Sequence, residues 1–230
     1  MVIGFLNFNM DIQPFKDTRY QLATRISLMV IFIFTILFLW LAKMVFLDQN
    51  MQLDNAAAAY AQASVSPKKT TFYSLITYLG SQQFLVPAYL LLLILFLLVR
   101  KLRRYSWRLL VTVILGTLMM FGIKYLFGRE RPLDPLLAPA QGHSFPSGHS
   151  FSSLLFFGIL LFIAFLSFQQ KWKKILATML LLGASVLVAI SRVYLGVHFI
   201  TDVLAGLSLA IIWIFLNELF LYRKLPLLLS

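Results

Sequence analysis

The sequence predicts an all-α membrane protein, a six-transmembrane helix bundle with short extramembrane helices. The first observation is composition: of 230 residues, 60% are hydrophobic and 22 are Phe, and the mean hydropathy is +0.87. A soluble domain of this length cannot bury so much apolar surface, so the surplus must face lipid. The other two observations are six long apolar stretches and an uneven distribution of Lys and Arg. Because no linker, low-complexity segment or repeat divides the chain, we expect a single integral membrane domain over residues 1–230.

Six stretches are long enough, or nearly so, to cross about 30 Å of hydrocarbon at about 1.5 Å per residue. They are residues 26–47, 72–99, 107–127, 150–168, 175–195 and 200–222. The first is too long for the core of a signal peptide, and no small-residue cleavage site follows it at once, so we expect a membrane anchor. The fourth is the shortest and needs residues from the loops that flank it.

The basic residues predict the orientation of the bundle. Thirteen of the 20 Lys and Arg residues lie in the two terminal segments, between the second and third stretches, and between the fourth and fifth. By the positive-inside rule these regions are cytoplasmic, so both termini lie inside. We therefore expect a multi-pass protein of the cell inner (plasma) membrane whose loops 48–71, 128–149 and 193–199 face the periplasmic or extracellular side. The alanine-rich segment DNAAAAYAQAS in the first of these loops predicts a short helix at the membrane surface.

The charge and the absence of cysteine limit the partners. A net charge of +12 raises the question of nucleic acid, but the basic residues gather at the ends of apolar stretches. Anionic lipid headgroups explain that placement better, so we expect the bilayer as a partner, no nucleic acid and no obligate protein partner. Without cysteine, disulfides and Cys-ligated metal sites are excluded.

A polar cluster breaks the charge rule on the outer side. Four cations fall in segments that also hold all three histidines: the cations are Lys124, Arg129, Arg131 and Arg192, and the histidines are His143, His149 and His198. Ionisable groups at the ends of membrane helices are costly and are usually paired or functional. Taken singly, each cation could instead reach lipid phosphates from the interface.

Three of these cations can converge on one oxyanion. Lys124 lies in the last turn of the third predicted helix, and Arg192 ends the fifth. Arg131 is predicted to lie beyond a helix end, because the residue before a proline avoids the α region. Arg offers a planar fork of donors that suits phosphate, and Lys adds a point charge.

The segment PSGH predicts a helix start that can bind phosphate. Ser147 can cap a helix that begins near His149, and Gly148 allows close approach of the backbone. The free N–H groups and the positive dipole end of such a helix favour an anion. The simpler interpretation is a capped helix with a histidine at the interface.

The segment SRVYLGVHFITD predicts an oriented histidine. Gly196 is expected at the turn between the fifth and sixth helices, and His198 and Asp202 are expected on one helix face, four residues apart. A carboxylate on one imidazole nitrogen leaves the other with a free lone pair, as in a nucleophile or base. An ordinary His–Asp pair at a helix start is the alternative.

The whole set predicts phosphoryl transfer without a metal. One histidine is held by a carboxylate and can attack, and the other can give a proton. The cations and the helix end stabilise the charge that spreads over the equatorial oxygens. Three cations would repel a divalent ion, and the sequence has no His-Glu-x-x-His helix, so we expect no metal and no cofactor.

Together the three segments resemble the type 2 phosphatidic acid phosphatase (PAP2) superfamily. Its pattern is Lys-x6-Arg-Pro, then Pro-Ser-Gly-His, then Ser-Arg-x5-His-x3-Asp. This sequence reads KYLFGRERP from Lys124, PSGH from Pro146 and SRVYLGVHFITD from Ser191, so every defining position matches in order and spacing. The motifs cover residues 124–202, and the other helices agree in number and placement with the six-span members of the family.

The resemblance implies a role for each matching residue. His198 would be the nucleophile that forms a transient phosphohistidine, Asp202 would orient it, and His149 would protonate the leaving oxygen. The phosphoryl oxygens would be bound by Lys124, Arg131, Ser147, Gly148 and Arg192. His143 and Arg129 lie outside the pattern; either could contact a second phosphate or headgroup, but we expect both at the surface.

The resemblance also implies a lipid phosphatase that acts at the outer membrane face on a lipid whose tails stay in the bilayer. Phosphatidic acid, phosphatidylglycerol phosphate and polyprenyl diphosphates such as undecaprenyl diphosphate all suit. Two alternatives stay open at this point: a lipid-to-lipid phosphotransferase of the same superfamily, and a non-catalytic lipid-binding or transport protein.

Overall fold

The computed structural model describes residues 18–100, 102–133, 135–136 and 141–221, with the backbone alone at residues 18–20 and 221. In this part of the chain all regular elements are helical: α1 (Thr18–Phe46), α2 (Gln52–Ala63), α3 (Pro67–Tyr78), α4 (Gln82–Leu98), the short 3-10 turn η2 (Arg103–Tyr105), α5 (Ser106–Phe127), α6 (Gly148–Ser167), α7 (Lys171–Tyr194) and α8 (Ile200–Leu221). Six helical segments, with α3 and α4 counted as one, are long and apolar enough to cross a membrane. The predicted class and six-span bundle are confirmed.

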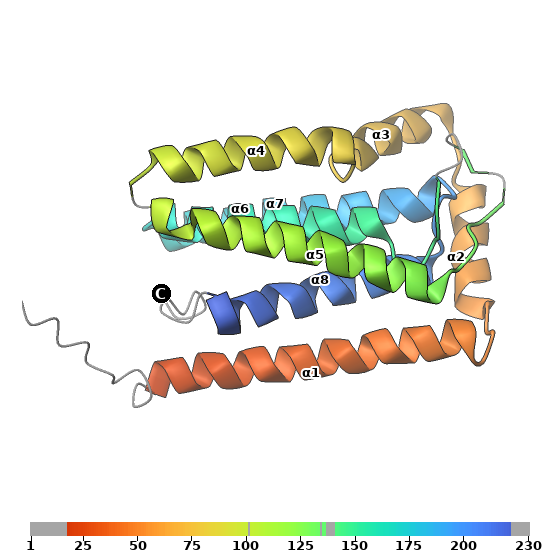
Figure 1. Ribbon diagram of the computed structural model, residues 1–230. Helices are drawn as coiled ribbons and strands as arrows, with labels where there is room; N and C mark the ends of the chain where they lie inside the picture. Colours follow the sequence, from red (N-terminus) through yellow and green to blue (C-terminus); the bar gives the residue numbers. More distant parts are fainter. Residues whose placement is uncertain (1–17, 101, 134, 137–140, 222–230) are drawn as a thin grey trace, which may run out of the picture.

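The long helices lie side by side, and α2 lies across one end of the bundle (Figure 1). The start of α1 and the end of α8 are at the opposite end, as an even number of spans requires. In the bundle α1 packs along α8, and α6 packs against both α7 and α8. Of the six spans α6 is the most buried, so its N-terminus is enclosed by its neighbours.

The predicted helix at the alanine run is confirmed as α2, and two helical segments begin ahead of the approximate span starts expected from hydropathy. α1 begins at Thr18 rather than near residue 26. The second span begins at Pro67, where the Ser66 hydroxyl accepts the Lys69 N–H, and it is interrupted between Tyr78 and Gln82. Hydropathy does not register this break, because the residues that interrupt the helix do not end the apolar stretch. Four of the basic residues that were predicted to be cytoplasmic lie outside the described residues: Lys16, Lys101, Arg223 and Lys224.

The outer surface of the bundle is apolar, as a lipid-facing surface must be. Large side chains such as Phe32, Leu98 and Tyr125 are exposed on the spans. Inside, buried polar groups pair with one another: the Thr112 hydroxyl donates to Asn217 Oδ1 (2.8 Å), and Trp213 Nε1 donates to the Thr112 carbonyl (2.9 Å). These hydrogen bonds join α5 to α8 where lipid offers polar groups no partner.

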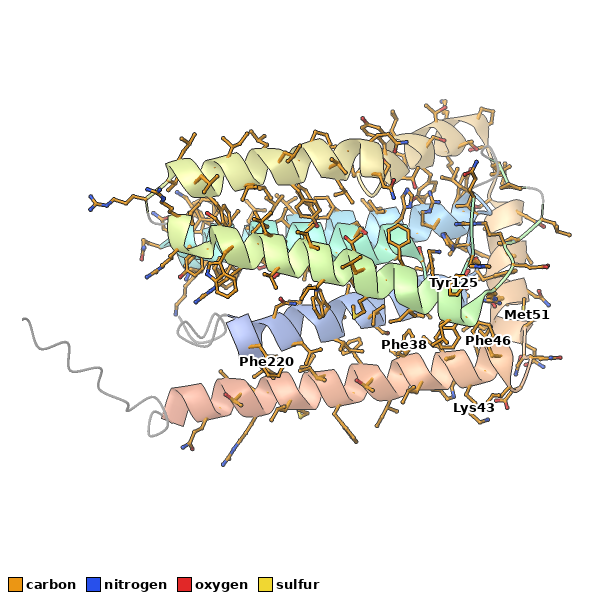
Figure 2. The ribbon with its side chains drawn as sticks, viewed as in Figure 1. Phe38, Lys43, Phe46, Met51, Tyr125 and Phe220 are labelled. Carbon is orange, nitrogen blue, oxygen red and sulfur yellow. The ribbon has the colours of Figure 1, made fainter. Side chains whose placement is uncertain are left out.

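An aromatic cluster anchors the loop that leads into α6. Phe145 is fully buried, and its ring centroid lies 5.8 Å from Phe38, 5.3 Å from Phe46 and 5.1 Å from Phe127. Phe38 and Phe46 project from α1 toward the bundle, and Lys43 projects away from it (Figure 2). The peptide bond between Phe145 and Pro146 is cis. α1, far from the sequence motifs, therefore helps to fix the segment that carries one of them.

The same segment touches α8 at Gly206. The Ser147 N–H donates to the Asp202 carbonyl (2.9 Å), and a Cβ on Gly206 would lie 2.5 Å from the Ser147 carbonyl oxygen. No side chain fits at that distance, so only glycine lets the loop reach α8.

Gly206→Ala is therefore expected to destabilise the protein by about 1–3 kcal/mol, the usual cost of overpacking. The measurement is the thermal unfolding midpoint of the purified protein in detergent. Gly183→Ala is the matched control, because a Cβ at Gly183 on α7 meets nothing within 4 Å. Equal midpoints for the two variants would contradict this account of the α6 loop.

Candidate active site

The predicted site residues come together at the α2 end of the bundle. Here the end of α5, the start of α6, the end of α7 and the start of α8 meet. Two of these residues form the centre of the site: His198 is 3% exposed and Asp202 is 0% exposed. Imidazole and carboxylate are thus removed from water, which strengthens every charge interaction they make.

His198 and Asp202 are in contact, but not for the predicted reason. Nδ1 of His198 lies 3.4 Å from Oδ2 of Asp202. His198 precedes α8, which begins at Ile200, so the two residues do not share a helix face. Instead Asp202 turns back over the helix start, and its Oδ2 accepts the Phe199 N–H at 2.9 Å. A helix cap, rather than i,i+4 spacing, brings the carboxylate to the imidazole.

Ser144 is a site residue that the sequence motifs missed. It is fully buried, and its hydroxyl donates to Oδ2 of Asp202 at 2.5 Å. Because a hydroxyl has one proton, the Ser144 oxygen is left to accept from Nδ1 of His198, 3.2 Å away. This contact is shorter than the direct His–Asp contact, so Ser144 bridges the pair. It lies two residues before the Pro-Ser-Gly-His segment, and no sequence motif includes it. The signal that identifies it is its complete burial in the structure.

The other ring nitrogen of His198 faces Arg131. With the proton on Nδ1, Nε2 presents a lone pair, and Nη1 of Arg131 lies 3.2 Å from it. The remaining Arg131 donors bind the carbonyls of Gln141, Gly142, His143 and Val197. Arg131 lies beyond the end of α5, as predicted, and it ties the loop before α6 to the turn before α8.

Burial keeps the His198 imidazole neutral. Loss of water lowers the pKa of His198 to about 4; Asp202 opposes the shift, and the cations Arg192 and Arg131 add to it. Above this pH the ring carries one proton, which the Ser144 and Asp202 oxygens hold on Nδ1. At neutral pH Nε2 therefore carries no proton, and its lone pair faces Nη1 of Arg131.

Lys124 and Arg192 approach the same place from two other helices. Nζ of Lys124 donates to the His143 carbonyl and, at 3.4 Å, to that of Ser144, and the Lys124 side chain lies beside Gly148. Nη1 of Arg192 donates to the Thr77 hydroxyl on α3 at 2.6 Å. The buried Nε of Arg192 has no hydrogen-bond partner among the described residues. An unpaired buried donor is costly, so this guanidinium is ready for an anionic ligand.

The Pro-Ser-Gly-His segment starts a helix, as predicted. Ser147 caps α6, and its oxygen accepts the Ser150 N–H (3.4 Å) and hydroxyl (3.0 Å). His149 stands in the first turn, within electrostatic reach of His198, Lys124, Arg131 and Arg192. The break between α3 and α4 makes room for it, because a Cβ on Gly80 would lie 3.2 Å from the His149 ring.

The prediction for Arg129 is wrong. It was expected at the surface, but it is only 9% exposed and donates to Oδ1 of Asp202 at 2.6 Å and to Oδ2 of Asp54 at 2.7 Å. Arg129 lies outside the sequence pattern, and its two carboxylate partners, one of them on α2, are distant in the chain. The sequence therefore did not show that it pairs with them inside the protein. His143 is exposed, as expected.

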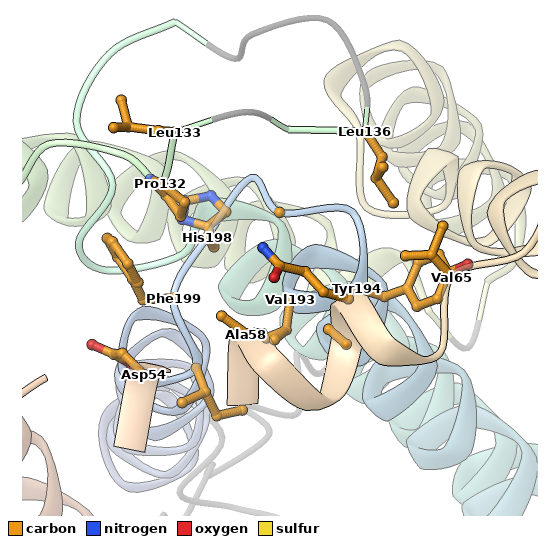
Figure 3. A pocket seen from close by; sticks show the side chains of 14 residues that line it. Asp54, Ala58, Val65, Pro132, Leu133, Leu136, Val193, Tyr194, His198 and Phe199 are labelled. Carbon is orange, nitrogen blue, oxygen red and sulfur yellow. The ribbon is translucent and has the colours of Figure 1, made fainter. Parts of the chain in front are cut away.

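A mostly apolar cavity borders His198 on the α2 side (Figure 3). One wall is α2 with Ala58, continued by Val65 just after this helix, and the other includes Pro132 and Leu136. The cavity is lined by His198 but by none of the three cations Lys124, Arg131 and Arg192. Among the described residues no group of three or more His, Cys, Asp or Glu side chains could hold a metal ion.

Comparison with known proteins agrees with this geometry. The family model of the PAP2 superfamily matches residues 105–225. Phosphatidylglycerophosphatase B of Bacillus subtilis (strain 168) is 34% identical over 187 residues, which cover 78% of this chain and 88% of that protein.

Two solved structures are similar to most of this chain. The crystal structure of a transmembrane PAP2 type phosphatidylglycerolphosphate phosphatase from Bacillus subtilis has a TM-score of 0.77 and 28% identity, covering 85% of this chain and 97% of that one. LpxE of Aquifex aeolicus has a TM-score of 0.59 and 25% identity, covering 74% and 98%. With its motifs, its bundle and these relatives, the chain belongs to the PAP2 superfamily and is a membrane lipid phosphatase.

Proposed function

We propose that this phosphatase hydrolyses the phosphate or diphosphate of a membrane lipid at the outer membrane face, without a metal, through a phosphohistidine on His198. The observation that carries the proposal is the state of that imidazole. Nδ1 is held by Ser144 and Asp202, and the Nε2 lone pair faces Arg131. A neutral, oriented and buried imidazole is what attack at phosphorus requires.

The first step is attack by Nε2 of His198 on phosphorus. A nitrogen–phosphorus bond forms as the bond from phosphorus to the lipid oxygen breaks, and His149 gives its proton to that oxygen. Asp202 and Ser144 then stabilise the positive charge on the imidazole ring. In the second step His149 takes a proton from water, the water oxygen attacks phosphorus, and the nitrogen–phosphorus bond breaks.

The cations supply stabilisation for the charge on the phosphoryl oxygens. Arg192 can use its unpaired Nε, and Arg131 can turn the Nη1 donor that faces Nε2 toward an oxygen. Lys124 and the first N–H groups of α6, with Gly148 and Ser147, complete the proposed anion site. Because His198 and Arg192 are buried, preorganised donors beside them act with little screening.

The substrate class follows from the surroundings and the relatives. The apolar cavity beside His198 suits the glycerol or alkyl part of a lipid next to its phosphate. The curated relative and one solved structure, both from Bacillus subtilis, are named as phosphatidylglycerol phosphate phosphatases, which favours that lipid first. Phosphatidic acid and polyprenyl diphosphates such as undecaprenyl diphosphate present the same phosphate and are the next candidates.

His198→Ala is expected to remove turnover. Purified protein in detergent with excess chelator should release phosphate from phosphatidylglycerol phosphate, phosphatidic acid or undecaprenyl diphosphate, and the variant should keep less than about 1% of kcat. Phosphate release is the measurement. Loss of wild-type activity on chelation would overturn the metal-free mechanism. If a substrate with a labelled phosphate passes the label to an added lipid acceptor instead of to water, the protein is a phosphotransferase.

The outer-face assignment rests on charge. The basic loop residues Arg100, Arg103, Arg104, Lys171, Lys173 and Lys174 lie at the end of the bundle opposite α2, which the positive-inside rule makes cytoplasmic. A reporter fused near Gln141 should be active only as a periplasmic or extracellular reporter, and one fused near Ser106 only as a cytoplasmic reporter. The reverse pattern would place the site on the cytoplasmic side.

Ser144→Ala is expected to lower kcat by roughly 10- to 100-fold with little change in KM, because a hydrogen bond to a charged group contributes about 1.5–3 kcal/mol. Ser144 touches the His–Asp pair and not the proposed phosphate position. Steady-state kinetics on the lipid substrate give the two constants. Ser185→Ala is the control, since Ser185 is also buried but its hydroxyl donates to the Leu181 carbonyl within α7, away from the His–Asp pair. Wild-type kcat in Ser144→Ala would rule out the bridge.

A further inference from the structure

The helix that lies across the end of the bundle contributes a buried charge to the site. Asp54 on α2 is fully enclosed and makes three contacts. Its Oδ1 accepts the Thr201 N–H at 3.0 Å, and its Oδ2 accepts the Thr201 hydroxyl at 2.9 Å and Nη2 of Arg129 at 2.7 Å. Asp54 is therefore tied both to the first turn of α8 and to the cation that pairs with Asp202.

Arg129 bridges the two carboxylates with separate nitrogens. Nη1 donates to Oδ1 of Asp202 at 2.6 Å and to the Thr201 hydroxyl at 2.8 Å, while Nη2 takes Asp54. The guanidinium also lies over the Phe199 ring, 4.1 Å from its centroid. The guanidinium thus contacts Asp54, Asp202, Thr201 and Phe199. It donates to Oδ1 of Asp202, the oxygen that does not face His198.

We infer that Arg129 and Asp54 are positioning residues that set the orientation and the effective charge of Asp202, and through it the reactivity of His198. α2 is then part of the catalytic machinery, and not only a cover at the membrane surface. The inference rests on the proposed nucleophilic role of His198.

The sign of the effect follows from counting charges. Asp54, Arg129 and Asp202 together carry one negative charge, which opposes the cations around the imidazole. With Asp54→Asn the group becomes neutral, so the positive imidazole of the phosphohistidine is less stable. With Asp54→Asn and Arg129→Met together, Asp202 alone carries the negative charge and loses its directly paired cation, so the imidazole becomes more basic than in the wild type.

His198 is faced by several other charges, which stay unchanged in these variants. They are Asp202 on α8, Arg192 on α7, Arg131 in the loop before α6 and His149 on α6, and Lys124 at the end of α5 acts on Asp202. Only the Asp54–Arg129 pair is altered, so a shift in His198 reports on that pair.

The first test compares Asp54→Asn with Asp48→Asn. Asp48 lies in the same segment between α1 and α3, but both Asp48 and its partner Lys43 are exposed. Asp48→Asn therefore makes the same chemical change outside the buried network. In steady-state kinetics on the lipid substrate, kcat of Asp54→Asn should fall roughly 10-fold or more with KM within about 3-fold, and Asp48→Asn should match the wild type. Equal kcat in the two variants, or a change in KM and unfolding midpoint alone, would overturn the inference.

The second test reads the imidazole directly, without turnover. In histidine-labelled protein in detergent, NMR titration should place His198 protonation about one pH unit higher in Asp54→Asn with Arg129→Met than in the wild type, and no higher in Asp54→Asn. His198→Asn assigns the resonance. The same titration in all three proteins would overturn the inference, and if the double variant does not fold, the kinetic comparison with Asp48→Asn decides.

These readouts separate the two proposals. If the wild type releases phosphate from no lipid, the proposed function fails while the titration still tests the network. If the wild type is active and the His198 titration is the same in the variants, the network fails alone.

Discussion

The site depends on one buried carboxylate. Asp202 is fully enclosed, and a lone carboxylate in such a place would be strongly unfavourable. Its two oxygens therefore collect four donors: the guanidinium of Arg129, the Ser144 hydroxyl, the Phe199 N–H and the His198 ring. Each donor comes from a different position in the chain, so satisfying this one charge brings α8, the loop after α5 and, through Asp54, α2 to one point.

The surrounding fold explains how such a polar site survives in a membrane protein. Large apolar side chains face outward to lipid, and the charges of the site gather at the α2 end, where backbone and side-chain partners bind them. Buried ion pairs contribute little to stability on balance, because desolvation offsets their attraction. The Asp54–Arg129–Asp202 network is better understood as a device that fixes geometry and charge, which fits its place behind the His198 ring.

Several residues of the site were predictable and several were not. The sequence motifs correctly predicted that His198 contacts Asp202, that Ser147 caps a helix and that Arg131 lies beyond α5. They missed Ser144 and Thr77, which act through hydroxyls, and they placed Arg129 at the surface. A single serine, threonine or arginine outside a motif belongs to no sequence pattern that would identify its role. Its role is set by which distant residue folds against it.

By itself the sequence determined the class, the number of spans, the family and the residues of the three motifs. Those features depend on hydropathy and on local spacing, which a linear chain carries in full. Only the tertiary structure decided how the motifs are held: the aromatic cluster around Phe145, the close contact at Gly206 and the link from α2 through Asp54 to Arg129. These contacts join residues that are distant in the chain, so they exist only once the helices have packed.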